Sequence, residues 1–195
     1  MQKSYVKYYH LQALNKSMTY FRTLLLSLFL FSGLLPVAMA ASLSYTLSSG
    51  DVISIQVYGE PDLSFERILL TDSGRISYPF LGELATIGKT PKALEKEIVT
   101  GLKNGYLKRP KVTVSIIEYR DFFMRGEVKN PGGYPYKPGL TVHKAIALAG
   151  GLTERASEGK MFLIKDGQPD QKPSRVKMRD KIGPGDIITI EQSFF

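Results

Sequence analysis

Residues 125–152 read RGEVKNPGGYPYKPGLTVHKAIALAGGL and carry turn, strand and helix signals within one short segment. Pro131-Gly132-Gly133 is typical of a turn, because proline fixes a negative φ and glycine accepts a positive one. It predicts a β-hairpin between Glu127-Val128 and Tyr134. Pro138-Gly139 is then expected to end the second strand.

The second half of this segment predicts a short helix. Thr141 can act as its N-cap, and Gly150-Gly151 suits the left-handed conformation that ends many helices. The apolar residues between them fall on one helical face: Val142, Ala145, Ile146 and Ala149. The segment combines these signals with no recognisable catalytic group, which favours assembly over chemistry.

The preceding residues predict a first α+β unit, from Tyr45 to about Glu118. Residues 52–57 alternate between apolar and polar side chains and predict a strand. A second alternating strand is expected at residues 110–117. The inward-facing residues of these strands are expected to be Ile53, Ile55, Val57, Val112, Val114 and Ile116.

Turn and helix signals lie between these two strands. Asp72-Ser73-Gly74-Arg75 is typical of a hairpin turn, and Pro79 predicts an edge strand or an early strand end. Thr90 and Pro91 can begin a helix as its N-cap and first residue, and Gly105 is expected to end it. Apolar residues recur every four positions along this helix: Leu94, Ile98 and Leu102.

A second small α+β unit is expected from about Tyr119 to Glu191. Residues 50–55 and 185–190 share the pattern Gly-Asp-aliphatic-Ile-hydroxyl-Ile, one in each unit. This echo is explained either by an internal repeat or by two strands entered through similar turns, since Gly and Asp suit tight turns.

Positive charge is distributed unevenly along the 195 residues. Lys3, Lys7, Lys16 and Arg22 precede residue 41 with no acidic residue among them. They supply half of the formal net charge of +8, and the remaining 22 cationic side chains face 18 carboxylates. This small excess gives weak support to a nucleic-acid surface, so no nucleic acid is expected as a partner.

The first forty residues have the features of a secretory signal. Residues 24–31 are apolar, Arg22 flanks them, and Ala38-Met39-Ala40 has the small-x-small pattern of a cleavage site. We expect residues 1–40 to be a signal peptide that is cleaved between Ala40 and Ala41. The alternative is a retained membrane anchor, although Gly33 and Pro36 interrupt the apolar run.

The start of translation is open between Met1 and Met18, since the polar stretch before the apolar run is long and Met18 would open a signal of conventional length. Nothing after residue 40 is expected to cross a bilayer as a helix.

The chain has no cysteine and two histidines, His10 and His143. An exported protein of this composition has no disulfide framework and no lipobox cysteine to acylate. One histidine remains after the expected signal, which argues against a zinc site or a histidine-assisted nucleophile. Carboxylates are frequent at residues 60–83, but the sequence shows no pair at the separation that glycosidases use. We therefore expect no enzyme, no catalytic residue, no metal and no cofactor.

Several aromatic residues on or beside the predicted strands have two possible roles. They could stack on sugar rings, or they could belong to cores or interfaces, as aromatic residues of small sheets usually do. These residues are Tyr58, Phe65, Tyr78, Tyr134 and Tyr136.

The order of these motifs resembles the bacterial outer-membrane polysaccharide export family, in which a polysaccharide export domain precedes a soluble ligand-binding β-grasp (SLBB) domain. The first domain is similar at residues 45–57, at 72–82 (DSGRISYPFLG) and at 88–90 (GKT). The second is similar at residues 126–134 (GEVKNPGGY) and 147–153 (ALAGGLT). The resemblance implies an α+β fold of two small domains, an export-type α/β sandwich at residues 41–118 and a β-grasp-like SLBB domain at residues 119–195.

Members of that family form ring-shaped periplasmic oligomers through which capsule, exopolysaccharide or O-antigen-like polymers leave the cell. The resemblance implies a periplasmic component associated with the outer membrane, whose homo-oligomeric ring conducts polymer toward that membrane. Its implied partners are the polysaccharide, an inner-membrane polysaccharide co-polymerase and a separate outer-membrane β-barrel. The barrel is expected to be separate because this sequence departs from long family members: it has no lipobox cysteine, one SLBB-like unit and no C-terminal amphipathic helix.

Four cations are candidates for the path of an acidic polymer: Arg67, Arg75, Arg125 and Lys129. Each could equally be part of a charged outer surface. The alternative function is an envelope glycan- or protein-binding module without a role in transport.

Overall fold

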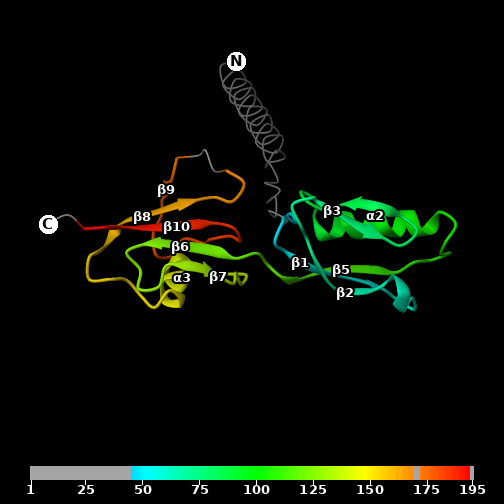
Figure 1. The fold of residues 1–195 in the computed structure, drawn as a ribbon, viewed down its shortest axis with the longest axis horizontal. Helices are drawn as coiled ribbons and strands as arrows, with labels where there is room; N and C mark the ends of the chain where they lie inside the picture. Colours follow the sequence, from blue (N-terminus) through cyan, green and yellow to red (C-terminus); the bar gives the residue numbers. More distant parts are fainter. Residues whose placement is uncertain (1–44, 169–171, 194–195) are drawn as a thin grey trace, which may run out of the picture. The chain divides into compact units, whose positions relative to one another are not determined.

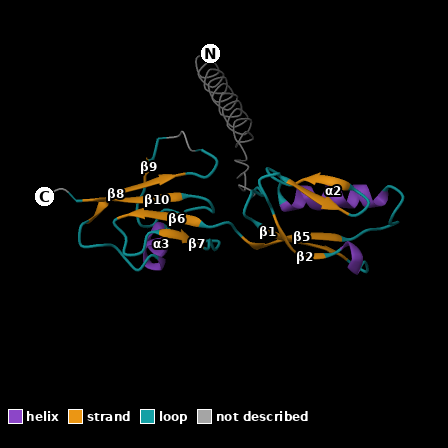
Figure 2. Cartoon of the chain, viewed as in Figure 1, coloured by secondary structure: helices purple, strands orange, loops and turns teal. Residues whose placement is uncertain are grey.

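The computed structural model describes residues 45–168 and 172–193, which form two α+β modules (Figure 1). We call residues 45–118 the first module and residues 122–193 the second module. The expected class, α+β with two small domains, is confirmed (Figure 2). The expected signal peptide and its cleavage site at Ala40 and Ala41 lie outside the described residues. No helix in the described ranges is long and apolar enough to span a membrane.

The first module combines a three-stranded antiparallel sheet, in the order β2-β1-β5, with a β3-β4 hairpin and one long helix. Its elements are β1 (Val52–Val57), η1 (Pro61–Leu63), β2 (Phe65–Leu69), β3 (Arg75–Tyr78), β4 (Gly82–Ala85), α2 (Pro91–Lys103) and β5 (Val112–Glu118).

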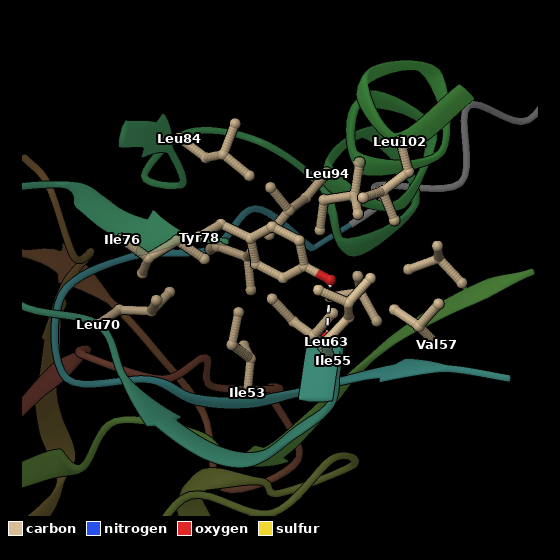
Figure 3. Packing of buried hydrophobic residues seen from close by; sticks show 14 residues of the cluster. Ile53, Ile55, Val57, Leu63, Leu70, Ile76, Tyr78, Leu84, Leu94 and Leu102 are labelled. Carbon is tan, nitrogen blue, oxygen red and sulfur yellow. Dashed lines mark hydrogen bonds between the residues drawn. The ribbon is translucent and has the colours of Figure 1, made fainter. Parts of the chain in front are cut away.

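The core of the first module lies between the sheet and α2 (Figure 3). The expected inward residues of β1 are buried, and Leu94, Ile98 and Leu102 of α2 are fully buried opposite them. Helix α2 begins as the sequence predicts, because the Thr90 side chain accepts a hydrogen bond from the backbone N–H of Ala93. The alternating strand and the four-residue helical spacing therefore produce one shared core.

The turn at residues 72–75 is not a hairpin turn, so that prediction is wrong. Strand β2 pairs with β1, whereas β3 pairs with β4 around Pro79, and the 72–75 turn carries the chain from the sheet to the hairpin. Gly74 takes a φ of 67°, and its carbonyl accepts hydrogen bonds from the backbone and side chain of Thr86. Strand β3 ends before Pro79, as expected, because proline has no N–H for the ladder.

Tyr78 is a core residue rather than a sugar-stacking candidate. Its side chain is 2% exposed, and its hydroxyl donates a 2.7 Å hydrogen bond to the carbonyl of Leu63 (Figure 3). Burial raises the pKa of Tyr78 to about 12, above the usual value of 10.0.

This raised pKa predicts a loss of stability at alkaline pH. Below pH 10 the tyrosine is protonated in both states, so its contribution to stability is complete. Between pH 10 and about 12 the unfolded state ionises first, and the free energy of unfolding is expected to fall. Urea unfolding at pH 8, 10 and 11 measures the effect, and Tyr78→Phe is expected to lose less stability over this range. Parallel declines of the two proteins would contradict the prediction.

The second module is a five-stranded mixed sheet with one short helix. The strand order is β7-β6-β10-β8-β9; β10 runs parallel to β6, and the other neighbours are antiparallel. Its elements are β6 (Phe122–Gly126), β7 (Gly132–Tyr134), α3 (Val142–Leu148), β8 (Ala156–Ile164), β9 (Ser174–Arg175) and β10 (Ile187–Gln192). A parallel pair at the centre of a mixed sheet with one helix is the arrangement of a β-grasp module.

The hairpin predicted from Pro131-Gly132-Gly133 exists, but its register differs from the prediction. Gly132 and Gly133 lie inside β7 and pair with Met124 and Phe123, so the turn is formed by residues 127–131. The helix prediction is confirmed: Thr141 caps α3 through the N–H of Lys144, and Gly150 and Gly151 take φ values of 81° and 95°. Local capping signals therefore located the helix, whereas strand pairing located the turn.

Candidate functional site

The sheet of the first module carries a groove of about 1130 Å³. Side chains alternate along a strand, so residues next to the core-facing Ile55 and Val57 point to the opposite face of β1. The groove is lined by Ser54, Ile55, Gln56, Val57, Tyr58, Gly59, Glu60, Pro61, Ser64, Phe65, Glu66, Lys111 and Thr113. Hydroxyl, amide and carboxylate groups of this kind can hydrogen-bond to sugar hydroxyls.

Tyr58 lines the groove and has an exposed side chain. It follows β1 directly and is 82% exposed. Its backbone N–H donates to the carbonyl of Lys111, and the Lys111 ammonium lies 5.8 Å from its ring centroid. Of the five aromatic residues proposed from the sequence, Tyr58 is the exposed one; Phe65, Tyr134 and Tyr136 are half-buried. The groove and Tyr58 together form a candidate binding surface.

Arg120 lies between the last strand of the first module and the first strand of the second. Its guanidinium donates to Asp51 at 3.2 Å, to Asp166 and to the hydroxyl of Tyr45. Asp51 has no exposed surface, and its carboxylate also accepts the N–H groups of Ser48 and Arg120 at 2.9 and 3.0 Å. One cation is therefore shared by carboxylates from both modules.

Aromatic rings pack beside this cation. Tyr119 makes edge contacts with Tyr45 and Tyr136, at centroid distances of 5.0 and 5.5 Å. Burial raises the pKa of Tyr45, and its hydrogen bond to Asp51 adds to the rise. Burial by itself would lower the pKa of Arg120, but the neighbouring Tyr45, Asp166 and Asp51 outweigh it and raise that pKa. The Arg120 guanidinium is therefore held in its charged form between the two carboxylates.

The Gly-Asp echo at residues 50–55 and 185–190 corresponds to one structural device used twice. Asp51 accepts the N–H of Ser48, and Asp186 accepts the N–H of Gly183, each three residues back. Each carboxylate is almost fully buried and is paired with a cation, Arg120 for Asp51 and Lys165 for Asp186. The shared pattern is accounted for by two strands entered through carboxylate-capped turns.

The four cations that the sequence suggests for a polymer path lie on four different segments of the chain. Arg67 on β2 pairs with Glu118 at 2.8 Å, and this exposed pair lowers the pKa of Glu118 through hydrogen bonding to Arg67. Arg75 on β3, Arg125 on β6 and Lys129 after β6 are exposed side chains. Their place along a polymer path stays a prediction.

Among the described residues, no group of three or more His, Cys, Asp or Glu side chains could hold a metal ion. His143 is an exposed residue of α3. The groove contains Glu60 and Glu66 together with serine and threonine hydroxyls, an arrangement that suits binding of a hydroxyl-rich ligand.

Family profiles match both modules. Residues 39–117 match the polysaccharide biosynthesis/export protein family, and residues 122–177 match the SLBB domain. The chain therefore carries a polysaccharide biosynthesis/export domain as its first module and an SLBB domain as its second module. The first of these belongs to a family of polysaccharide export proteins rather than of enzymes.

Curated relatives agree with this assignment. The chain is 44% identical over 92 residues to the exopolysaccharide production protein ExoF of Rhizobium meliloti, covering 46% of this chain and 22% of the relative. It is 26% identical over 187 residues to the EPS I polysaccharide export outer membrane protein EpsA of Ralstonia nicotianae, covering 79% of this chain and 49% of the relative. The chain spans about half or less of the length of these relatives.

The sequence interpretation missed the residues at the junction and two exposed aromatic rings. Arg120 stands in the short connection between the units, where no periodic pattern marks a contact. Phe80 falls within the motif at residues 72–82, and no periodic pattern marks Phe80 or Tyr106 as an exposed ring. A glycine lies close to each of these aromatic residues, Gly82 to Phe80 and Gly105 to Tyr106. Glycine is frequent in exposed turns, so these glycines are the sequence feature that indicates exposure.

Proposed function

We propose that this protein is a periplasmic component of a polysaccharide export machine, acting on capsule polysaccharide or exopolysaccharide and associated with the outer membrane. The observation that carries the proposal is the order of its two modules, an export domain followed by an SLBB domain. The names of its relatives, which describe exopolysaccharide production and export, support it. Arg67, Arg75, Arg125 and Lys129 remain candidates for the polymer path.

The proposed working form is a homo-oligomeric ring that conducts polymer toward the outer membrane. Strands β2 and β5 are the edges of the three-stranded sheet, and unpaired edges can bind a neighbouring subunit. Leu69 on β2 and Ile117 on β5 are exposed apolar residues at these edges, 60% and 47% exposed. Head-to-tail contacts between different edges close into a ring when the rotation from subunit to subunit returns to its start. An inner-membrane co-polymerase and a separate outer-membrane channel protein are the proposed partners.

Light scattering tests the ring. The protein purified from the cell envelope is expected to have a mass of several subunits, alone or with an outer-membrane extract. Leu69→Lys with Ile117→Lys is expected to reduce this mass to that of a monomer, because charge at a strand edge opposes pairing. Leu148→Lys is the matched control, since Leu148 is 52% exposed on α3, away from both edges. A strict monomer under both conditions would contradict the ring.

The polar groove beside Tyr58 favours a second function, a glycan-binding module without a transport role. A monomer that binds oligosaccharide in this groove, together with unchanged polymer export in a deletion strain, would support that function instead.

A further inference from the structure

Three exposed aromatic side chains lie shortly after the ends of β1, β3 and α2 in the first module. Tyr58, Phe80 and Tyr106 are 82%, 64% and 49% exposed, and we call the surface around Phe80 and Tyr106 the aromatic end. Tyr58 follows the end of β1, which pairs with the beginning of β5 where the α2-β5 loop enters. Phe80 lies in the β3-β4 turn and stacks on Tyr106 of that loop, with centroids 4.8 Å apart and planes at 27°. The β3-β4 turn and the α2-β5 loop are separated in the sequence, so the fold brings Phe80 and Tyr106 together.

Phe80 is exposed to solvent and has an unfavourable backbone conformation. Its φ is 65°, and among the described residues it is the one non-glycine residue with a positive φ. Bulky residues rarely take this conformation, and such strain is concentrated at functional sites. The next residue explains how the conformation is held: the Leu81 side chain packs on Gly101 so closely that a Cβ there would lie 2.7 Å from it. Leu81 thus anchors the turn while Phe80 points outward.

The same end carries concentrated positive charge. No acidic residue occurs between Glu97 and Glu118, and the intervening segment contains four exposed cations: Lys103, Lys108, Arg109 and Lys111. In the part of the chain that the structure describes, none of these four forms an ion pair with a carboxylate within 4.0 Å. Acidic residues also occur in other elements of this module, among them Asp62 in η1 and Glu83 in β4. A ligand with its own carboxylates would find unpaired cations here.

We propose that the aromatic end binds an acidic polysaccharide, with sugar rings against Phe80 and Tyr106 and carboxylates paired with the loop cations. The proposal deepens and rests on the proposed export function. A sugar polymer fits better than a membrane surface because the adjoining groove presents Ser54, Gln56 and Thr113, which match hydroxyl groups rather than acyl chains.

Binding assays with defined polymers test this proposal. The full chain, purified from the cell envelope, is titrated by calorimetry with alginate oligosaccharides, which carry a carboxylate on every sugar, and with neutral dextran oligosaccharides. Tighter binding of alginate, weakened by salt, is expected. Lys103→Ala with Lys108→Ala and Arg109→Ala is expected to weaken alginate binding by about tenfold or more. The charge-matched control is Lys137→Ala with Lys144→Ala and Arg179→Ala, which removes the same charge from the second module.

The aromatic contribution is separated from folding by two substitutions of Phe80. Phe80→Gly is expected to weaken alginate binding by about tenfold while leaving the melting temperature unchanged or higher, because glycine accepts the positive φ. Phe80→Tyr keeps a ring and is expected to retain binding. Equal binding of alginate and dextran, equal losses in both triple variants, or unchanged binding by Phe80→Gly would overturn the proposal.

Two further readouts separate this proposal from its alternatives. Vesicles containing phosphatidylglycerol are expected not to bind, and vesicle binding lost in the Phe80→Gly variant would overturn the proposal in favour of a membrane-contacting surface. Light scattering on the same samples reports the ring independently. If the protein forms a ring but its alginate binding does not change in these variants, the proposed export function stands and the proposed acidic-polymer site is wrong. Site-dependent binding by a strict monomer supports the site and contradicts the ring.

Discussion

Replacing Asp51 with alanine is expected to destabilise the protein by about 3 kcal/mol or more, because several donors around the buried carboxylate would lose their acceptor. The Asp51 carboxylate is fully buried and accepts hydrogen bonds from the backbone of Ser48, from Arg120 and from the hydroxyl of Tyr45. The Arg120 side chain is 17% exposed and would keep Asp166 as its carboxylate partner. Urea unfolding of the wild type and the variant measures the difference.

Asp166 provides the matched control for Asp51. It pairs with the same guanidinium, but its side chain is 38% exposed, so Asp166→Ala is expected to cost about 1 kcal/mol or less. Asp51→Asn keeps the shape of the side chain but removes its charge, and it is expected to fall between the two alanine variants. Equal destabilisation by Asp51→Ala and Asp166→Ala would show that burial does not set the strength of this junction.

Gly126→Ala is expected to cost about 3 kcal/mol or more, since it combines backbone strain with a steric clash. Gly126 ends β6 with a φ of 80°, and a Cβ there would lie 2.0 Å from the carbonyl oxygen of Ile190. That oxygen also accepts the N–H of Glu127, so it cannot move without loss of the parallel β6-β10 pairing. The substitution is expected to abolish native pairing of these strands, which amide hydrogen exchange of residues 122–126 would measure.

Gly139 separates strain from the steric clash. It has a similar φ of 84°, but nothing lies within 4 Å of the position of its Cβ. Gly139→Ala is therefore expected to cost about 1 kcal/mol, from the positive φ alone. If Gly126→Ala lowered the free energy of unfolding no more than Gly139→Ala, the close approach of the Ile190 carbonyl would not contribute to the destabilisation.

The helices and the buried faces of the main strands could be predicted from the sequence. Thr90 and Thr141 cap their helices, and glycines end them, because capping is decided within one turn of the chain. The inward positions of β1 and β5 follow from simple alternation. The family resemblance rested on the same local motifs in order.

Strand partners and the composition of the candidate sites were decided by the tertiary structure. The turn at residues 72–75 has the residues of a hairpin turn, yet β2 pairs with β1 and β3 pairs with β4. The Arg120 cluster joins residues separated by 69 and 46 positions, and Phe80 meets Tyr106 across the β3-β4 turn and the α2-β5 loop. Caps, alternation and glycine turns act over a few residues and are legible in the sequence, whereas contacts between distant segments exist only once the core has packed.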